Sequence, residues 1–408
     1  MGITYEDLLE AVSGRAVGVR AKIELEPLGG PGDKVFPPTY GVSQSAQTKY
    51  AMEDRYDPAM DEPVKSVVLD SVPSQANRFE LALLEALRRG EIAMPVTSVD
   101  FSPFPDLGLD RLSDLEAPHR IFDALLRDSY DGDVLFRFGP TGHAITEATS
   151  RNAGALFHHA PATLVFGGWD STGPKGGRGA KYERALTSEI VASSVTVGVK
   201  TSSRIDPAAI EKAAVVYQAA EGGDLSWTLD PLDAALDKGK PILAGSKDSK
   251  GSPSAVNHGN IAPSIDVRSG GVTARAIVAT TVLSFIQLRR LRLSAGGDAD
   301  SAAHAALAAL GLAAAVLAFD GGFDLRSRCV LVAKGPVEFE MIDRDGGSRT
   351  FGVTAREACA LVAHASERSA DAGLPWRTEE LVLRPSDRLV DLIGRSRKHA
   401  TASGDTEE

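Results

Sequence analysis

The sequence predicts a fold that mixes strands and helices, of the α/β or the α+β class. Residues 17–25 alternate apolar and polar side chains with the period of two that marks a half-buried strand. Residues 301–319 instead form an uncharged, alanine-rich run of helical length. Long loops rich in glycine and proline lie between such segments, which argues against a regular series of βαβ units. No dinucleotide-binding glycine fingerprint follows the first strand.

The N-terminal part of the chain predicts a helix, a strand and a loop, and then a second strand that leads into a longer helix. Residues 5–12 predict a short helix and residues 17–25 the first strand, followed by a Gly/Pro-rich loop at 25–40. Residues 64–69 predict a second strand. The helix after it has Ser74 as a candidate cap and ends at Gly90, and its apolar side chains recur at helical spacing: Phe79, Leu83, Leu84 and Leu87.

The middle of the chain is dominated by loops. Pro118 is expected to open another helix, and residues 162–166 predict a short apolar strand that runs into a polar loop at 167–179. Residues 190–199 predict a strand. Residues 220–260 consist mostly of Gly, Ser, Asp, Lys and Pro, and predict a long inserted excursion that is either functional or mobile.

The last third alternates between the two kinds of element. Residues 272–293 are apolar and β-branched and fit a strand or a helix. Residues 301–319 approach the length of a membrane span, but their alanine content and flanking aspartates favour a buried helix of a soluble protein. Strands at 327–333 and 337–342 and a helix at 354–369 follow. We expect one elaborated domain over 1–395 and a disordered tail at 396–408.

Composition and charge narrow the class of protein. The 408 residues are 43% hydrophobic and 24% charged, which excludes a wholly disordered chain and a small disulfide scaffold. The acidic N-terminus has no secretory signal, so we expect a cytoplasmic protein. The net charge of −11 argues against a protein that coats nucleic acid with its whole surface. Residues 151–292 nevertheless carry 17 basic and 12 acidic side chains, which marks either a local polyanion site or chance clustering on solvated faces.

The most informative motif is the Gly-rich segment at 164–190. It places four cations three residues apart: Lys175, Arg178, Lys181 and Arg184. Trp169 and Tyr182 are suited to stacking on bases. A polyanion-binding loop and an ordinary surface loop remain alternatives. A nucleotide-binding loop fits poorly, because a proline stands where a Walker A motif has its lysine.

Three further segments are candidates for binding. The loop at 25–40 carries one cation, Lys34, and reads equally as a structural loop. The helix start near Ser74 brings Gln75, Asn77 and Arg78 to a position that favours phosphate, although an ordinary capped helix explains it too. His119 and Arg120 follow Pro118 and could bind phosphate or be structural.

The sequence shows no metal-ligand spacing among its histidines and no nucleophile elbow. A nuclease built on paired carboxylates would have Asp170 as its nearest candidate, and that residue equally suits an Asx-turn.

Taken together, these segments resemble the RAMP-type backbone subunit of subtype I-G (formerly I-U) CRISPR Cascade. The resemblance is carried, in chain order, by LEPLGGPGDKVFPPTY, LDSVPSQANRFE, APHRIFDALLRDS and LVFGGWDSTGPKGGRGAKYER. It covers about residues 20–205, and IAPSIDVRSGGVTARAIV and SFIQLRRLRL fit it more loosely.

The resemblance implies an α+β fold, an RRM- or ferredoxin-like RAMP palm with large loop and helical insertions. It implies a non-catalytic subunit of antiviral defence that oligomerises along a CRISPR RNA and presents it for pairing with a target DNA strand. The implied partners are that RNA, the target DNA strand, copies of the chain in a helical filament, other Cascade subunits and a helicase-nuclease, with no membrane, cofactor or metal. The implied RNA-binding residues are Lys34, Gln75, Asn77, Arg78, His119, Arg120, Ser171, Lys175, Arg178, Lys181, Arg184, Arg204 and Arg268.

Two alternatives from other classes remain. One is an RNA-processing endonuclease of the same superfamily that uses His119 or Asp170. The other is a nucleotide-dependent enzyme that uses the Gly-rich loop.

Overall fold

The protein is represented by a computed structural model, which describes residues 2–58, 60–173, 179–221, 226–245, 250–293 and 296–403. The chain divides into two units. The first comprises Met1–Val42, Lys49–Val197 and Val272–Leu389, and the second comprises Ser43–Thr48, Gly198–Gly271 and Val390–Glu408. Both helices and sheets build the first unit, which confirms the predicted α+β class.

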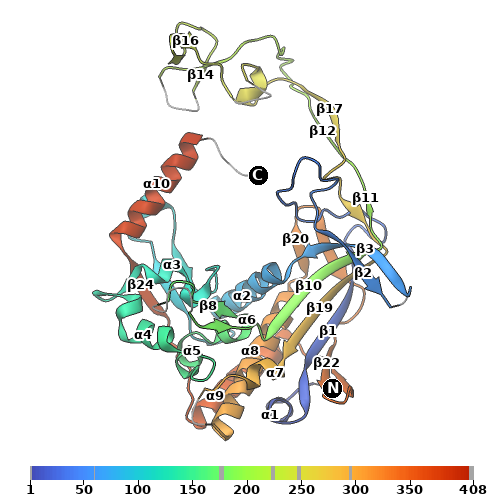
Figure 1. Cartoon of the computed structure of the whole chain (residues 1–408), viewed down its shortest axis with the longest axis vertical. Helices are drawn as coiled ribbons and strands as arrows, with labels where there is room; N and C mark the ends of the chain where they lie inside the picture. Colours follow the sequence, from blue (N-terminus) through green and yellow to red (C-terminus); the bar gives the residue numbers. More distant parts are fainter. Residues whose placement is uncertain are drawn as a thin grey trace. The chain divides into compact units, whose positions relative to one another are not determined.

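The first unit is organised around a nine-stranded antiparallel sheet (Figure 1). Its strand order is β2-β3-β10-β19-β1-β21-β20, with β22 paired to β1 and β23 paired to β22. The strands are β1 (Ala16–Pro27), β2 (Met52–Asp57), β3 (Glu62–Asp70), β10 (Leu186–Ser193), β19 (Ala276–Ser284), β20 (Phe323–Arg326), β21 (Cys329–Ala333), β22 (Phe339–Asp343) and β23 (Ser348–Phe351).

A ferredoxin-like core lies inside this sheet. Strand β19 lies between β1 and β10 and is antiparallel to both, while β21 pairs with the other edge of β1. Helix α2 (Val72–Arg88) precedes β10 in the chain, and helix α8 (Asp298–Asp320) lies between β19 and β21. The chain order β1-α2-β10-β19-α8-β21 with its spatial order 4-1-3-2 is the βαββαβ arrangement that the sequence resemblance implied.

Helices cover one face of the sheet. Helix α8 packs against α2, against α1 (Tyr5–Ser13) and against α9 (Ala355–Asp371). Its most apolar 18-residue window is 89% buried, so the alanine-rich run is a core helix, as predicted. The apolar side chains of β1 point to this helical face, whereas Arg20, Lys22 and Glu24 lie on the opposite face.

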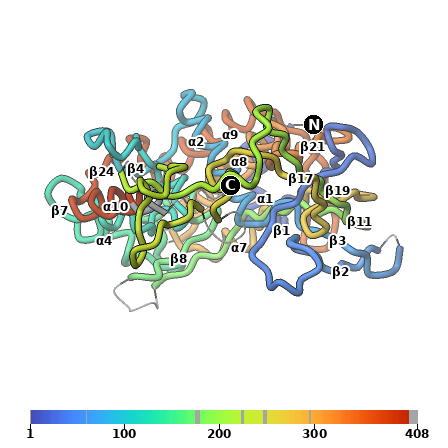
Figure 2. Tube along the Cα trace, turned by 90° about the horizontal axis from the view of Figure 1, so that it is seen from above, coloured from blue at the N-terminus to red at the C-terminus, as the bar shows by residue number. Residues whose placement is uncertain are grey.

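A smaller five-stranded sheet in the same unit has the order β5-β4-β24-β6-β7. Its strands are β4 (Thr97–Asp100), β5 (Arg111–Ser113), β6 (Ser129–Asp131), β7 (Val134–Leu135) and β24 (Leu381–Pro385). Figures 1 and 2 show this sheet and the β2–β3 hairpin at opposite ends of the first unit. The same part of the chain forms short helices: η1 (Pro105–Leu107), η2 (Arg120–Phe122), α3 (Ala124–Arg127), η3 (Phe136–Phe138), α4 (Pro140–Glu147), α5 (Gly154–His159) and α6 (Pro161–Phe166), the last of which packs against α8.

The second unit is built mainly from residues 198–271. Strands β12 (Lys200–Arg204) and β17 (Ile261–Asp266) form an antiparallel pair, which leads to two short hairpins and η5 (Pro253–Val256). The hairpins pair β13 (Tyr217–Gln218) with β14 (Trp227–Thr228), and β15 (Leu236–Asp237) with β16 (Lys240–Pro241). In the first unit, β11 (Thr196–Val197) pairs with β18 (Val272–Thr273).

Several sequence predictions need correction. Residues 162–166 are helical (α6) and not a strand, because all of them are buried and the apolar run carries no periodicity that separates the two. Pro118 opens no long helix, since Arg120 has a left-handed φ of 52° and the chain restarts at α3. Residues 272–293 contain both alternatives, the strand β19 and then the helix α7 (Phe285–Arg289), which Ser284 caps.

Two helix ends also differ from expectation. The residue at the start of α2 is Ser71 and not Ser74, whose hydroxyl donates to Asp70. Helix α10 (Asp387–Ser403) includes residues 396–403 of the tail that the sequence predicted as disordered at 396–408, and residues 404–408 lie outside the described residues. An Arg395–Asp391 pair at i,i+4 spacing on this helix favours its continuation.

Candidate nucleic-acid interface

The base of the Gly-rich segment is a short hairpin. Strand β8 (Gly168–Trp169) pairs with β9 (Lys181–Tyr182), so that Gly168 faces Tyr182 and Trp169 faces Lys181. We call residues 168–173 and 179–182 the loop neck. Lys175 and Arg178, two of the predicted RNA contacts, lie outside the described residues.

The neck presents an aromatic ring and a cation together. The Trp169 side chain is 42% exposed, and the Lys181 ammonium lies 4.7 Å from the centroid of its indole ring. Such a pair supplies a positive charge for phosphate and an adjacent π face on which a base can stack. Ser171, also exposed, belongs to the same neck.

Arg184 stands just beyond the neck. Arg184 is exposed as a residue, although desolvation by its surroundings and the nearby Arg120 charge lower its pKa, with Glu80 acting in the opposite direction. Glu183 beside it is paired with Arg290 of the segment after α7, at 3.0 Å between exposed groups. Arg184 therefore keeps its charge available at the surface of the first unit.

Asp170 is not an exposed carboxylate. Its Oδ1 accepts a hydrogen bond from Arg137 Nη2 at 2.8 Å, and the same guanidinium donates through Nη1 to the Thr172 carbonyl at 2.6 Å. Sequence reasoning missed Arg137 because it lies 33 residues earlier and no local motif connects the two.

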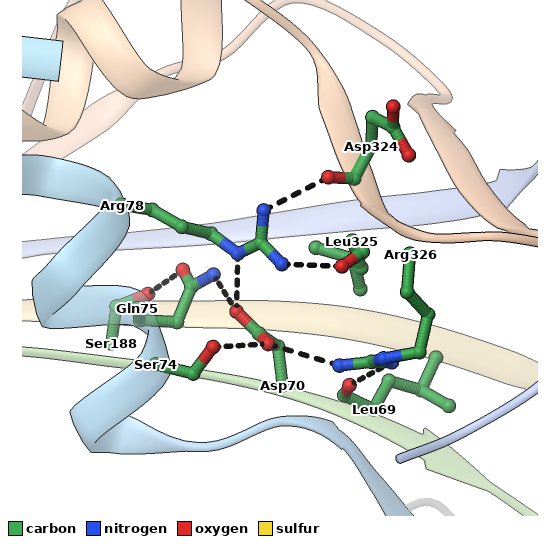
Figure 3. Close-up of polar contacts among 9 residues, drawn as sticks. All are labelled: Leu69, Asp70, Ser74, Gln75, Arg78, Ser188, Asp324, Leu325 and Arg326. Carbon is green, nitrogen blue, oxygen red and sulfur yellow. Dashed lines mark hydrogen bonds and ion pairs between the residues drawn. The ribbon is translucent and has the colours of Figure 1, made fainter. Parts of the chain in front are cut away.

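Figure 3 shows that two of the candidates at the start of α2, Gln75 and Arg78, belong to a network around the buried Asp70. The carboxylate accepts from Ser74 Oγ, Gln75 Nε2, Arg78 Nε and Arg326 Nη2. Gln75 also accepts from Ser188 of β10, and Arg78 donates to the carbonyls of Asp324 and Leu325. Gln75 and Arg78 thus join the sheet to α2, and the contacts with RNA that the resemblance implied for them stay a prediction. Asn77 is exposed on the helix surface.

Arg120 is also structural. It is buried, and its guanidinium makes a two-point contact with Glu80 of α2, at 2.6 Å from Nε and 2.8 Å from Nη2. Its Nη1 donates to the Gly167 carbonyl, just before the neck. Burial raises the pKa of Glu80 to about 7, against the opposing effect of Arg120. These contacts give Arg120 a structural role, and its contact with RNA stays a prediction, whereas His119 is exposed.

The remaining candidates lie elsewhere. Lys34 is half-buried in a loop that is joined to β18 through the Val35–Val272 bridge. In the second unit, Arg204 donates to the carbonyls of His258 and Gly259, and Arg268 donates to the carbonyl of Ser43. The structure thus brings together Trp169, Ser171 and Lys181 at the neck, with Arg184 beside them.

A groove of about 710 Å³ lies on the face of the large sheet opposite to α8. Its floor includes Val191 and Val278, and Lys22 and Arg275 are among its cations. Thr187 of β10, three residues after Arg184, lines the same groove. Arg55 also lies there but is paired with Glu189 at 2.7 Å.

Within the described ranges, no three His, Cys, Asp or Glu side chains come together as a metal site would require.

Comparison with known proteins gives one family. Residues 19–197, somewhat under half of the chain, match the family model of the CRISPR-associated protein GSU0053. No curated protein matches the chain. The matched range contains most of β1 and all of α2, the loop neck and β10. This match supports a CRISPR-associated protein with a role in CRISPR defence.

Proposed function

We propose that the chain is a non-catalytic, RNA-binding backbone subunit of a CRISPR effector complex, of the RAMP type found in subtype I-G Cascade. Copies of it assemble along one CRISPR RNA in the cytoplasm and present the bases to a target DNA strand. Other Cascade subunits and a helicase-nuclease act with it.

The loop neck carries this proposal. An exposed indole ring with an ammonium 4.7 Å from its centroid, and Arg184 close by in the chain, form a surface suited to a single strand. Lys181 and Arg184 contact phosphates, and Trp169 stacks on a base without selecting its identity. The ferredoxin-like sheet supports this assignment, as does the CRISPR-associated family match over residues 19–197, a range that includes the loop neck.

The positions of the two candidate catalytic residues support a role without catalysis. The Asp170 carboxylate is buried and engaged by Arg137. His119 is exposed on η2's N-terminal side, where its backbone amide donates to the Asp123 carboxylate. In this proposal neither side chain acts on RNA.

The experiment combines assembly and turnover. The full chain is sedimented with and without guide-length RNA, and labelled RNA and DNA are incubated with it in Mg²⁺ or Mn²⁺. The proposal predicts RNA-dependent assemblies and intact nucleic acid. Cleavage that disappears in a His119→Ala or Asp170→Ala variant would favour the endonuclease, and a monomer in both sedimentation samples would refute the backbone role.

A further inference from the structure

A side chain from another element holds the loop neck in place. Arg137 lies in η3, and its two terminal nitrogens reach the Asp170 carboxylate at 2.8 Å and the Thr172 carbonyl at 2.6 Å. The side chains of Arg137 and Asp170 are only 14% and 3% exposed. The guanidinium thus binds two positions of the segment that follows β8, the Asp170 side chain and the Thr172 backbone, with two directed hydrogen bonds.

Asp170 in turn organises the neck. Its Oδ1 accepts from the Thr172 amide at 3.3 Å, and its own amide donates across the neck to the Ala180 carbonyl at 3.2 Å. The returning strand passes so close that a Cβ at Gly179 would collide with the Asp170 carbonyl oxygen. Only glycine fits there, so this part of the Gly-rich composition reflects packing around Asp170.

The element that holds Arg137 is itself well fixed. Phe136 is buried, and the Gly139 amide donates to the carbonyls of Leu135 and Phe136. Helix α4 approaches so closely that a Cβ at Gly142 would collide with the Phe136 carbonyl oxygen. Arg137 therefore extends to the neck from a rigid base.

We propose that Arg137 is a positioning residue for RNA binding. This inference rests on the proposed function. By holding Asp170 and Thr172, Arg137 keeps the neck in the conformation that exposes Trp169 beside Lys181. It also neutralises the Asp170 carboxylate, which would otherwise stand as an unpaired anion beside the phosphates. Arg137 acts through these groups and does not contact RNA itself.

The consequences differ between three variants of the full chain. Arg137→Ala removes both hydrogen bonds and leaves a buried carboxylate without its partner, which is the more damaging way to break an ion pair. RNA binding should weaken about tenfold, as when the binding-competent conformation falls to about a tenth of the population. The double variant Arg137→Ala/Asp170→Ala also removes the unpaired Asp170 carboxylate, so it should regain part of the lost RNA affinity. Arg137→Lys keeps the charge but loses the two-point geometry of the guanidinium, so its RNA affinity should lie between those of wild type and Arg137→Ala.

Two readouts separate positioning from direct contact. RNA binding is measured at several salt concentrations, and hydrogen exchange is followed in peptides that cover 168–173. For Arg137→Ala we expect weaker binding at every salt concentration, an unchanged slope of log K against log salt, and faster exchange in the neck but not in β1 or β19. Arg111→Ala, which removes an exposed pair with Glu380, is the matched control and should change neither readout.

The inference fails if the salt slope falls by about 0.7, because Arg137 would then itself contact a phosphate. It also fails if exchange in the neck is unchanged, or if the neck opens while affinity stays at the wild-type value. If the wild-type chain binds no RNA at all, the proposed function is refuted, and the exchange arm still decides whether Arg137 holds the neck.

Discussion

The network around Asp70 yields a quantitative prediction about stability. The Asp70 side chain is fully buried, and it receives four side-chain hydrogen bonds, two of them from the arginines Arg78 and Arg326. Asp70→Ala leaves two guanidinium groups without their shared anion, together with a buried amide donor on Gln75. Breaking a buried ion pair from one side costs about 3–5 kcal/mol.

The structure places the expected value at the lower end of that range. The two arginine side chains are 32% and 27% exposed, so solvent stabilises them once the carboxylate is gone. Arg78 also keeps its hydrogen bonds to the carbonyls of Asp324 and Leu325. We therefore expect the free energy of unfolding to fall by about 3 kcal/mol in Asp70→Ala.

The assay is urea unfolding of the full chain, compared with an exposed-pair control. Asp345→Ala removes a pair with Arg15 in which both side chains are more than half exposed, and it should change the free energy of unfolding by less than about 1 kcal/mol. The urea midpoint of Asp70→Ala should fall with an unchanged m-value. A change no larger than that of the control would refute the view that the contacts of Gln75 and Arg78 with Asp70 stabilise the fold.

Other predictions concern binding and pH. Trp169→Ala should lose about 1–3 kcal/mol of RNA affinity, to a similar extent for different RNA sequences, and titration with several oligonucleotides checks this. Burial, with smaller effects from His158 and Arg377, lowers the pKa of His159 to about 4, so the unfolded state binds more protons between pH 6.5 and 4. The free energy of unfolding should therefore fall as the pH is lowered through this window, and thermal unfolding of His159→Gln should show a weaker pH dependence than wild type.

Local sequence patterns predicted the regular elements well. The period-two alternation of residues 17–25 became β1, and the alanine-rich run became the core helix α8. Both predictions rest on patterns that are set by one face or by complete burial. The strand predicted at residues 162–166 was wrong, because a short apolar run that is buried on all sides fits a helix as well as a strand.

The candidate site was predictable only where its residues are close in sequence. Trp169, Lys181 and Arg184 were found from the composition of one segment. Trp169 and Lys181 face each other across the neck, and their side chains are in contact. The roles of Gln75 and Arg120 depend on partners far along the chain: Ser188, and Glu80 on α2. A helix start that binds a phosphate and one that binds a buried carboxylate of the same chain carry the same polar residue types, so the sequence did not distinguish the two roles.

The salt dependence of RNA binding by Lys181→Ala/Arg184→Ala tests the central claim most directly. Each phosphate contact with a single strand contributes about 0.7 to the slope of log K against log salt. If both cations contact RNA, the magnitude of this slope should decrease by about 1.4, with the circular dichroism spectrum unchanged. Lys238→Ala/Lys240→Ala, which removes two exposed lysines of the second unit, should keep more of the wild-type slope. A folded Lys181→Ala/Arg184→Ala protein with the full wild-type slope would contradict the assignment of the loop neck as the RNA-binding site.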